Sequence, residues 1–259
     1  MKRKMNVLLL ALTVFILGTG SAFGISYFGY DEFGGTWHDA NKDWDGDTML
    51  CWAAAASNVL DWGGWEASGY DTESSIFDNY EDHWTDEGSL SDYGWQWWFY
   101  GKDITPGPGW ASVDVAGGGD HFSTYNYDDY YHEYWSNDTM SAVDDYLHSG
   151  YGVSLAVYTY GGGHALTAWG FEYDADGNYQ GVYVTDSDDY VTELQYYSVS
   201  WNDTYNSWDL GGAYNGWYIG GVMALDTNAA SAVVPEPGTI ILLCFGLLGL
   251  AGLRRKYKK

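Results

Sequence analysis

The pattern of apolar and polar residues from Asp47 to Trp62 predicts a buried helix at the centre of a domain. Apolar and small residues recur there every three or four positions, which places them on one helix face. They are Cys51, Ala54, Ala55, Asn58, Val59 and Trp62. Asp47 or Thr48 can serve as the N-cap. The four alanines at 53–56 would let a neighbouring sheet approach the helix axis closely.

After Gly152 the chain changes to short runs of β-branched and aromatic residues, separated by turns of Gly, Asp and Asn, which is typical of strands. The expected strands cover 153–160, 164–173, 179–186, 190–201 and 217–225. Helices are expected at 73–80, 93–100 and 140–148. The pattern therefore predicts most of the helix in the first half and a set of strands in the second.

The turn at 174–178 sets a register between two of these strands. If Tyr173 faces Tyr179, facing residues have numbers that sum to 352, so His164 lies opposite Asp188 and one diagonal step from Asp186. All three have even numbers and share one face of their strands. Either carboxylate could then accept a hydrogen bond from the His164 ring and fix its tautomer. A register slip of one residue would send both acids to the other face.

Both ends of the chain carry targeting patterns. Residues 1–24 have the basic start, apolar run and small residues of a secretory signal peptide, which signal peptidase would remove. Residues 234–259 begin with VPEPGT and continue with a short apolar stretch and a basic end, an order that resembles the PEP-CTERM sorting signal of exosortase-bearing bacteria. The resemblance implies that exosortase-type machinery removes this tail, and the alternative is a plain C-terminal transmembrane anchor. Both interpretations place residues 25–233 in the cell envelope or at the extracellular surface.

The composition of residues 25–233 excludes one class of partner. This region keeps two cations, Lys42 and Lys102, against 35 Asp and Glu, so its formal charge is near −33. Nucleic-acid binding is excluded, because phosphate contacts need a basic patch. The region also holds all 15 tryptophans. These rings either stack on sugars of an extracellular polysaccharide or form a core in place of aliphatic residues, and the sequence does not choose between the two.

Cys51 is the only cysteine of this region, since Cys244 lies in the tail. A lone cysteine is more often a small buried hydrophobe than a nucleophile. An unpaired cysteine in an exported chain risks mispairing, however, which favours a functional thiol. The start of a helix also favours a thiolate over a thiol. Lys42 lies nine residues earlier and could stabilise an oxyanion, although a solvated lysine is the simpler interpretation.

Two blocks of the sequence carry a family resemblance: NKDWDGDTMLCWAAAASNVLDW and GGGHALTAWGFEYDADGNYQGVYVTDSDD. Both are similar to the immunoglobulin-G-degrading, Mac-type (IdeS-like) cysteine endopeptidases. The resemblance implies that Cys51 is the nucleophile and His164 the general base and acid. Asp186 would orient His164 with support from Asp188, and Lys42 would share the oxyanion with the Cys51 amide. The spacing from Lys42 to Cys51 is one residue shorter than expected for the family.

The resemblance implies an α+β, papain-like cysteine protease fold, in which a central helix with the nucleophile packs on an antiparallel sheet. We expect an exported cysteine endopeptidase that cleaves an extracellular or envelope protein and needs no cofactor. No metal site is expected, because the spacing in the acidic run at 125–135 matches no ligand motif. The family's antibody substrate is not carried over. Two alternatives stay open: a non-catalytic polysaccharide-binding protein on the same scaffold, and another thiol enzyme such as a transglutaminase or amidase.

Overall fold

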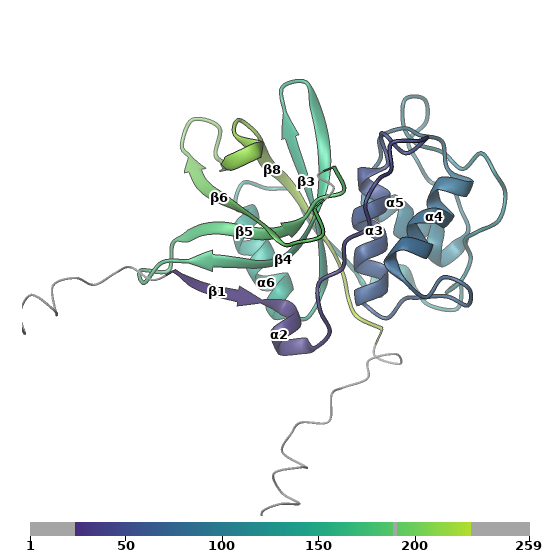
Figure 1. The fold of residues 1–259 in the computed structure, drawn as a ribbon, viewed down its shortest axis with the longest axis horizontal. Coiled ribbons are helices and arrows are strands. Elements are labelled where there is room, and N and C mark those ends of the chain that lie inside the picture. Colours follow the sequence, from purple (N-terminus) through teal and green to yellow (C-terminus); the bar gives the residue numbers. More distant parts are fainter. Residues whose placement is uncertain (1–23, 189–190, 229–259) are drawn as a thin grey trace, which may run out of the picture.

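The structure is a computed structural model that describes residues 24–188 and 191–228. Within them, eight antiparallel strands form one sheet in the order β1-β4-β3-β8-β7-β6-β5, with β2 added along β8. The strands are β1 (Ile25–Phe28), β2 (Tyr131–Tyr134), β3 (Gly152–Thr159), β4 (Gly162–Tyr173), β5 (Tyr179–Thr185), β6 (Gln195–Asn202), β7 (Ser207–Leu210) and β8 (Tyr218–Leu225). Because β5 also pairs with β4, the six strands from β3 to β8 close into a barrel (Figure 1).

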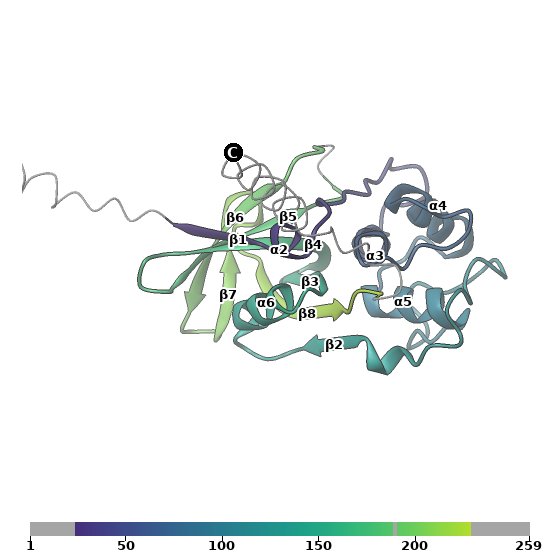
Figure 2. The same cartoon turned by 90° about the horizontal axis from the view of Figure 1, so that it is seen from below.

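The helices stand mostly apart from the strands in sequence and in space. They are α2 (Gly29–Phe33), α3 (Cys51–Trp62), α4 (Glu73–His83), α5 (Ser91–Tyr100) and α6 (Thr139–His148), with short 3₁₀ turns η1 (Tyr127–Asp129) and η2 (Gly212–Tyr214). Figure 1 shows α3, α4 and α5 together beside the strands, with α3 nearest to them. Figure 2 shows α6 on the strand side of the molecule, and β2 alongside β8.

The predicted papain-like α+β fold, with its central helix packed on an antiparallel sheet, is wrong, because the sheet closes on itself. Closure depends on β4, which is 12 residues long. Its first half pairs with β3, where His164 faces Val157, and its second half pairs with β5 as far as Tyr173. This stagger is what allows strands to tilt and close into a barrel. The hydrophobic pattern located most of the strands, but the pairing of distant strands leaves no mark on that pattern.

The predicted hairpin register is confirmed where the two strands meet. Tyr173 pairs with Tyr179, as expected from the turn. Two irregularities then shift the register, one next to Tyr173 and one between Ala168 and Gly170. They cancel, so Thr167 pairs with Thr185 and the sum of the two numbers is again 352. Beyond this pair, the side chains on both strands therefore point to the same face of the sheet that the sequence predicted.

The buried apolar side chains form two clusters. The first joins α3, α4 and α5 to one face of the sheet through Ala156, Ala165 and Met223. The second lies among the barrel strands and α6, and includes Val143, Leu166 and other aliphatic side chains. Along β3 the residues alternate between the two clusters, as the pleat of a strand requires. One sheet face thus supports the helix that begins with Cys51.

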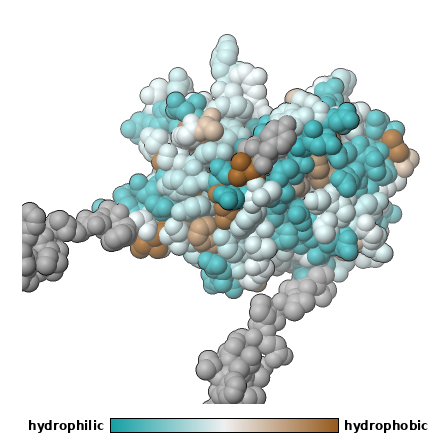
Figure 3. Space-filling view, viewed as in Figure 1, coloured by the Kyte–Doolittle hydropathy of each residue, from teal (hydrophilic) through white to brown (hydrophobic). Residues whose placement is uncertain are grey.

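The tryptophans are divided between the interior and the surface. Five of them are fully buried: Trp52, Trp65, Trp95, Trp97 and Trp98. The helical part of the protein therefore does use aromatic rings as core, which is one of the two interpretations of the composition. Other rings are more than a third exposed, Trp110 among them. Figure 3 shows hydrophilic residues over much of the visible face, in agreement with the acidic composition.

The helix α3 begins at Cys51 without the expected side-chain cap. Leu50 occupies the N-cap position, where no side-chain hydrogen bond is made. The buried carboxylate of Asp47 instead accepts the backbone amides of Asp43 and Trp44, at 2.7 and 2.8 Å. Asp47 thus stabilises the loop that leads into the helix. In the first turn of α3 the amide of Ala53 bonds to the carbonyl of Leu50 at 2.9 Å, and the amides of Cys51 and Trp52 point toward the end of the helix where Cys51 lies.

Asn58 joins α3 to two other parts of the chain. Its Oδ1 accepts the backbone N–H of Ala40 at 2.7 Å, and its Nδ2 donates to Thr167 Oγ1 of β4 at 3.0 Å. Thr185 of β5 in turn donates its hydroxyl to the carbonyl of His38 at 2.9 Å. These buried bonds fix the segment around residue 40, the helix and the two strands relative to one another.

No helix within the described residues has the length and apolar character needed to cross a membrane. The predicted signal peptide at 1–24 lies outside these residues except for Gly24. The predicted sorting tail at 234–259, with its apolar stretch, lies outside them entirely.

Replacing Asn58 by Ala should destabilise the fold. The change leaves the buried N–H of Ala40 and the hydroxyl of Thr167 without their partner, which costs about 1–3 kcal/mol of unfolding free energy. Urea unfolding of the full chain, followed by tryptophan fluorescence, measures the loss. Asn137→Ala, at an exposed position, is the matched control and should change the free energy by less than about 0.5 kcal/mol. Equal effects of the two substitutions would contradict this role of Asn58.

Candidate active site

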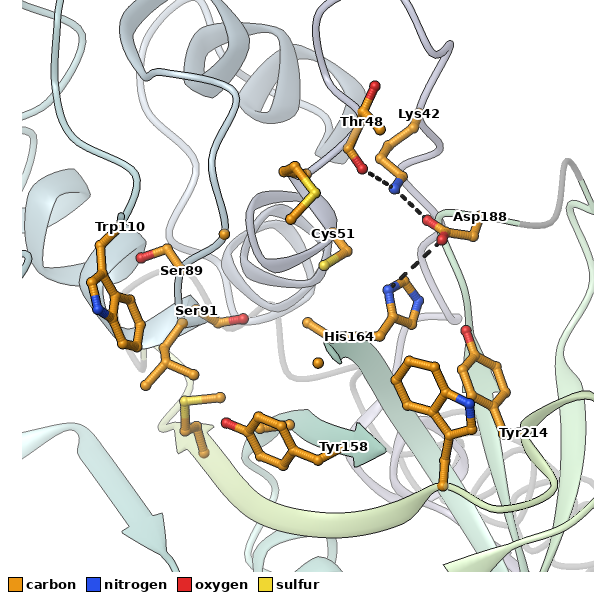
Figure 4. Close-up of a pocket in the computed structure, with 18 of the residues that line it drawn as sticks. Lys42, Thr48, Cys51, Ser89, Ser91, Trp110, Tyr158, His164, Asp188 and Tyr214 are labelled. Atoms are coloured by element: carbon orange, nitrogen blue, oxygen red, sulfur yellow. Dashed lines mark hydrogen bonds and ion pairs between the residues drawn. The ribbon is translucent and has the colours of Figure 1, made fainter. Parts of the chain in front are cut away.

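A cavity of about 430 Å³ lies where the start of α3 meets strands β3, β4 and β8. Cys51 and His164 both line it, together with Tyr158 and Trp110 (Figure 4). Cys51 is the first residue of α3 and is partly exposed, whereas His164 near the start of β4 is 9% exposed. Figure 4 shows the Cys51 side chain beside the His164 ring. The helix and the barrel thus each contribute one of the two reactive groups.

Asp186 holds the ring of His164 from its other side. Its Oδ1 lies 2.8 Å from His164 Nε2, and both side chains are almost fully buried. With Nε2 bonded to Asp186, Nδ1 is the ring nitrogen left to face Cys51. Asp186 follows directly after β5, where the predicted register placed it. The sequence left Asp186 and Asp188 open as partners of the ring, and the geometry favours Asp186.

Two opposing effects act on the titration of His164. Burial lowers its pKa, but hydrogen bonds with Asp186 and Cys51, and the negative charges on both, outweigh burial and raise the pKa to about 10. For Asp186, burial raises the pKa, while the hydrogen bond and charge of His164 lower it below its usual value. The imidazolium therefore persists at neutral pH beside the thiol.

Lys42 and Asp188 form an ion pair at the edge of the cavity. Lys42 Nζ lies 2.5 Å from Asp188 Oδ1 and donates to the carbonyl of Thr48 at 2.8 Å. Its side chain is 2% exposed, so the carboxylate compensates a charge that would be costly to bury alone. The other oxygen of Asp188 lies 3.9 Å from His164 Nδ1. The structure thus brings all five predicted site residues together, with Lys42 coupled to Asp188 rather than free.

Tyr214 is a part of the site that the sequence did not reveal. Its hydroxyl donates to Asp186 Oδ2 at 2.7 Å, and its ring stacks on His164 with centroids 5.7 Å apart. Burial and the nearby Asp186 charge raise the pKa of Tyr214, so its hydroxyl stays protonated and remains a donor. Tyr214 belongs to η2, in a stretch expected to be only turn and loop. It is one tyrosine among 25, and only the folded strand order brings it to Asp186.

Three groups of side chains in the described residues have a spacing that a metal ion could use. In the first, His38 Nδ1 already lies 2.8 Å from Asp61 and 3.4 Å from Glu73, as an ion pair would. The second is His164 with Asp186 and Asp188, whose mutual bonds are described above. The third comprises Asp43, Asp47 and Glu81. In the acidic run at 125–135, His132 stacks on Tyr151 with ring centroids 4.6 Å apart, which is a packing role.

Comparison with known families gives two matches. Residues 126–204 match the model of the Mac 1 family, and residues 233–256 match that of the PEP-CTERM protein-sorting motif. The first match contains His164, Asp186 and Asp188 but not Cys51 or Lys42. No curated protein matches the chain. Both resemblances found in the sequence are therefore confirmed. The Mac 1 family is associated with cysteine endopeptidase activity, and the sorting motif supports export and association with the cell envelope.

The geometry predicts an activated thiol at Cys51. Iodoacetamide should alkylate Cys51 faster in the wild-type chain than in His164→Ala at pH 6, because the His164 ring, whose pKa burial lowers but Asp186 and Cys51 raise to about 10, stays charged beside the sulfur at that pH. Mass spectrometry of the alkylated full chain distinguishes Cys51 from Cys244 in the tail.

Two variants serve as test and control for this reactivity. His164→Ala should remove the fast reaction at pH 6, whereas His148→Ala, at an exposed histidine of α6, should preserve it. A rate that rises with pH as for an ordinary thiol, and is unchanged in His164→Ala, would show that Cys51 is not activated.

Proposed function

We propose that the chain is an exported cysteine endopeptidase, in which Cys51 is the nucleophile and His164 the general acid and base. The main support is one observation: a buried His164 ring lies between Cys51 and Asp186, with Nε2 bonded to the carboxylate at 2.8 Å. Orienting the ring in this way is what a thiol–imidazole pair needs in order to transfer a proton at Nδ1. The match to the Mac 1 family and the sorting motif agree with this proposal. The exported unit would comprise residues 25–233.

The first half of the reaction is acyl transfer to sulfur. The Cys51 thiolate attacks the carbonyl carbon of a peptide bond, and the C=O electron pair moves onto oxygen. When the tetrahedral intermediate collapses, the C–N bond breaks and the His164 imidazolium gives its Nδ1 proton to the leaving amine. The products of this step are a free amine and a thioester on Cys51. Asp186, with Tyr214 bonded to its other oxygen, keeps the ring in place throughout.

The second half returns the site to its starting state. Neutral His164 accepts a proton from water, and the hydroxide attacks the thioester carbon. Collapse releases the carboxylic acid product and restores the Cys51 thiolate beside the imidazolium. In both halves the backbone N–H of Cys51, at the start of α3, would bind the oxyanion. Lys42 would assist through the positive charge of its ammonium, which Thr48 and Asp188 hold and which lies 4.3 Å from the centroid of the Trp44 ring.

Activity assays on a peptide library test this function. Cys51→Ala should abolish cleavage, and Asp186→Asn should lower kcat/KM by about a hundredfold, because the ring keeps its place but loses the charge that stabilises the imidazolium. Asp176→Asn, in the exposed turn after β4, is the control and should retain full activity. Product masses separate hydrolysis from transfer to an added amine. Cleavage at the normal rate by Cys51→Ala would disprove the proposal.

A further inference from the structure

We propose that the substrate carries a lysine or arginine, whose side chain enters a second pocket beside Trp110, between Glu87 and Asp103. This inference rests on the proposed peptidase function and names the class of substrate for the same cleft: a peptide segment with one basic residue at a fixed distance from the scissile bond.

The second pocket adjoins the cavity that contains Cys51. It has a volume of about 530 Å³, and the residues that line it include Glu87, Asp103 and Trp110. Gly109 and Trp110 line both spaces, so they form the boundary between them. Figure 4 shows Trp110 on the side of the cleft away from His164. A peptide that lies across Cys51 can therefore place a side chain past Trp110 and into this pocket.

The two carboxylates differ in how firmly they are held. Asp103 is fixed by its own loop, because Oδ1 accepts the amide and hydroxyl of Thr105 at 3.0 and 2.8 Å, and Oδ2 accepts the amide of Val113 at 3.1 Å. Glu87 is exposed, and no other described residue forms a hydrogen bond or ion pair with its carboxylate. The carboxylate of Asp103 is thus held in place before a ligand binds, and the carboxylate of Glu87 can move to contact the ligand.

The two carboxylates and the indole ring of Trp110 both favour a cationic side chain in this pocket. The ring of Trp110 is 38% exposed beside the two acids, and an ammonium or guanidinium over an indole face is attracted to it. The part of the chain that the structure describes has two lysines and no arginine to neutralise these acids. Within the described residues Lys42 is buried against Asp188, and Lys102 Nζ lies 5.7 Å from the ring of Tyr100. A substrate cation would fill this role, whereas an acidic side chain would be repelled.

Binding to an inactive protein separates this inference from the peptidase proposal. We would use the full chain with Cys51→Ala and fluorescein-labelled peptides that are identical except for one lysine, moved through eight successive positions. The reference peptide has norleucine at that position, which keeps the length of the side chain and removes the charge. The lysine peptide should bind about tenfold more tightly than the norleucine peptide at one of these positions only, because the pocket receives the side chain of one position. General attraction to an acidic protein would instead favour lysine at every position.

Variants of the pocket give the second test. Glu87→Gln, Asp103→Asn and Trp110→Ala should each reduce the tenfold preference to about threefold, and Asp176→Asn should leave it unchanged. The inference is overturned if lysine and norleucine peptides bind equally, if neither binds, or if the preference survives in the pocket variants. Cleavage of peptides by the wild-type chain, measured separately, would stand in each of these cases.

Discussion

The hydrogen bond between Asp186 and His164 is the contact on which the geometry of the site depends. The carboxylate is buried, and three donors hold it: the His164 ring, the Tyr214 hydroxyl and the amide of Asp188. These donors come from β4, from η2 and from the residues that follow β5. A buried carboxylate satisfied in this way stays ionised and cannot turn freely. It therefore fixes both the position and the charge of the imidazole that faces Cys51.

A second set of contacts holds Cys51 to the same frame. Asn58 fixes α3 to β4 and to the backbone at Ala40, and the backbone N–H of Lys42 bonds to the carbonyl of Ser187 at 3.2 Å. These bonds hold the segment between residues 40 and 51 against Ser187 and Asp188, the two residues that follow Asp186. The ion pair of Lys42 with Asp188 strengthens this link. The nucleophile and the group that orients its partner are joined by a short path through buried polar contacts.

The candidate site residues follow from local patterns of the sequence, whereas the closed barrel does not. Cys51, His164 and the two aspartates were located by a helix start and by the period of a hairpin, which are local properties. The register survived because two irregularities in β4 and β5 cancel. The closed barrel was missed because it needs β3 to pair with β8, and these two strands are about sixty residues apart with no turn that connects them directly. Tyr214 was missed for the same reason, since it reaches Asp186 only through the order of β6, β7 and β8.

The protonation state of His164 tests the account most directly. The ¹⁵N chemical shifts of its two ring nitrogens can be followed in the full chain from pH 5 to pH 10.5. Both nitrogens should stay protonated well above pH 8, because burial lowers the pKa of His164 but Asp186 and Cys51 raise it to about 10. In Cys51→Ala the transition should move to lower pH, since one of the two raising partners is lost. A transition near the ordinary value of about 6.5 in the wild-type chain would contradict the thiolate–imidazolium pair.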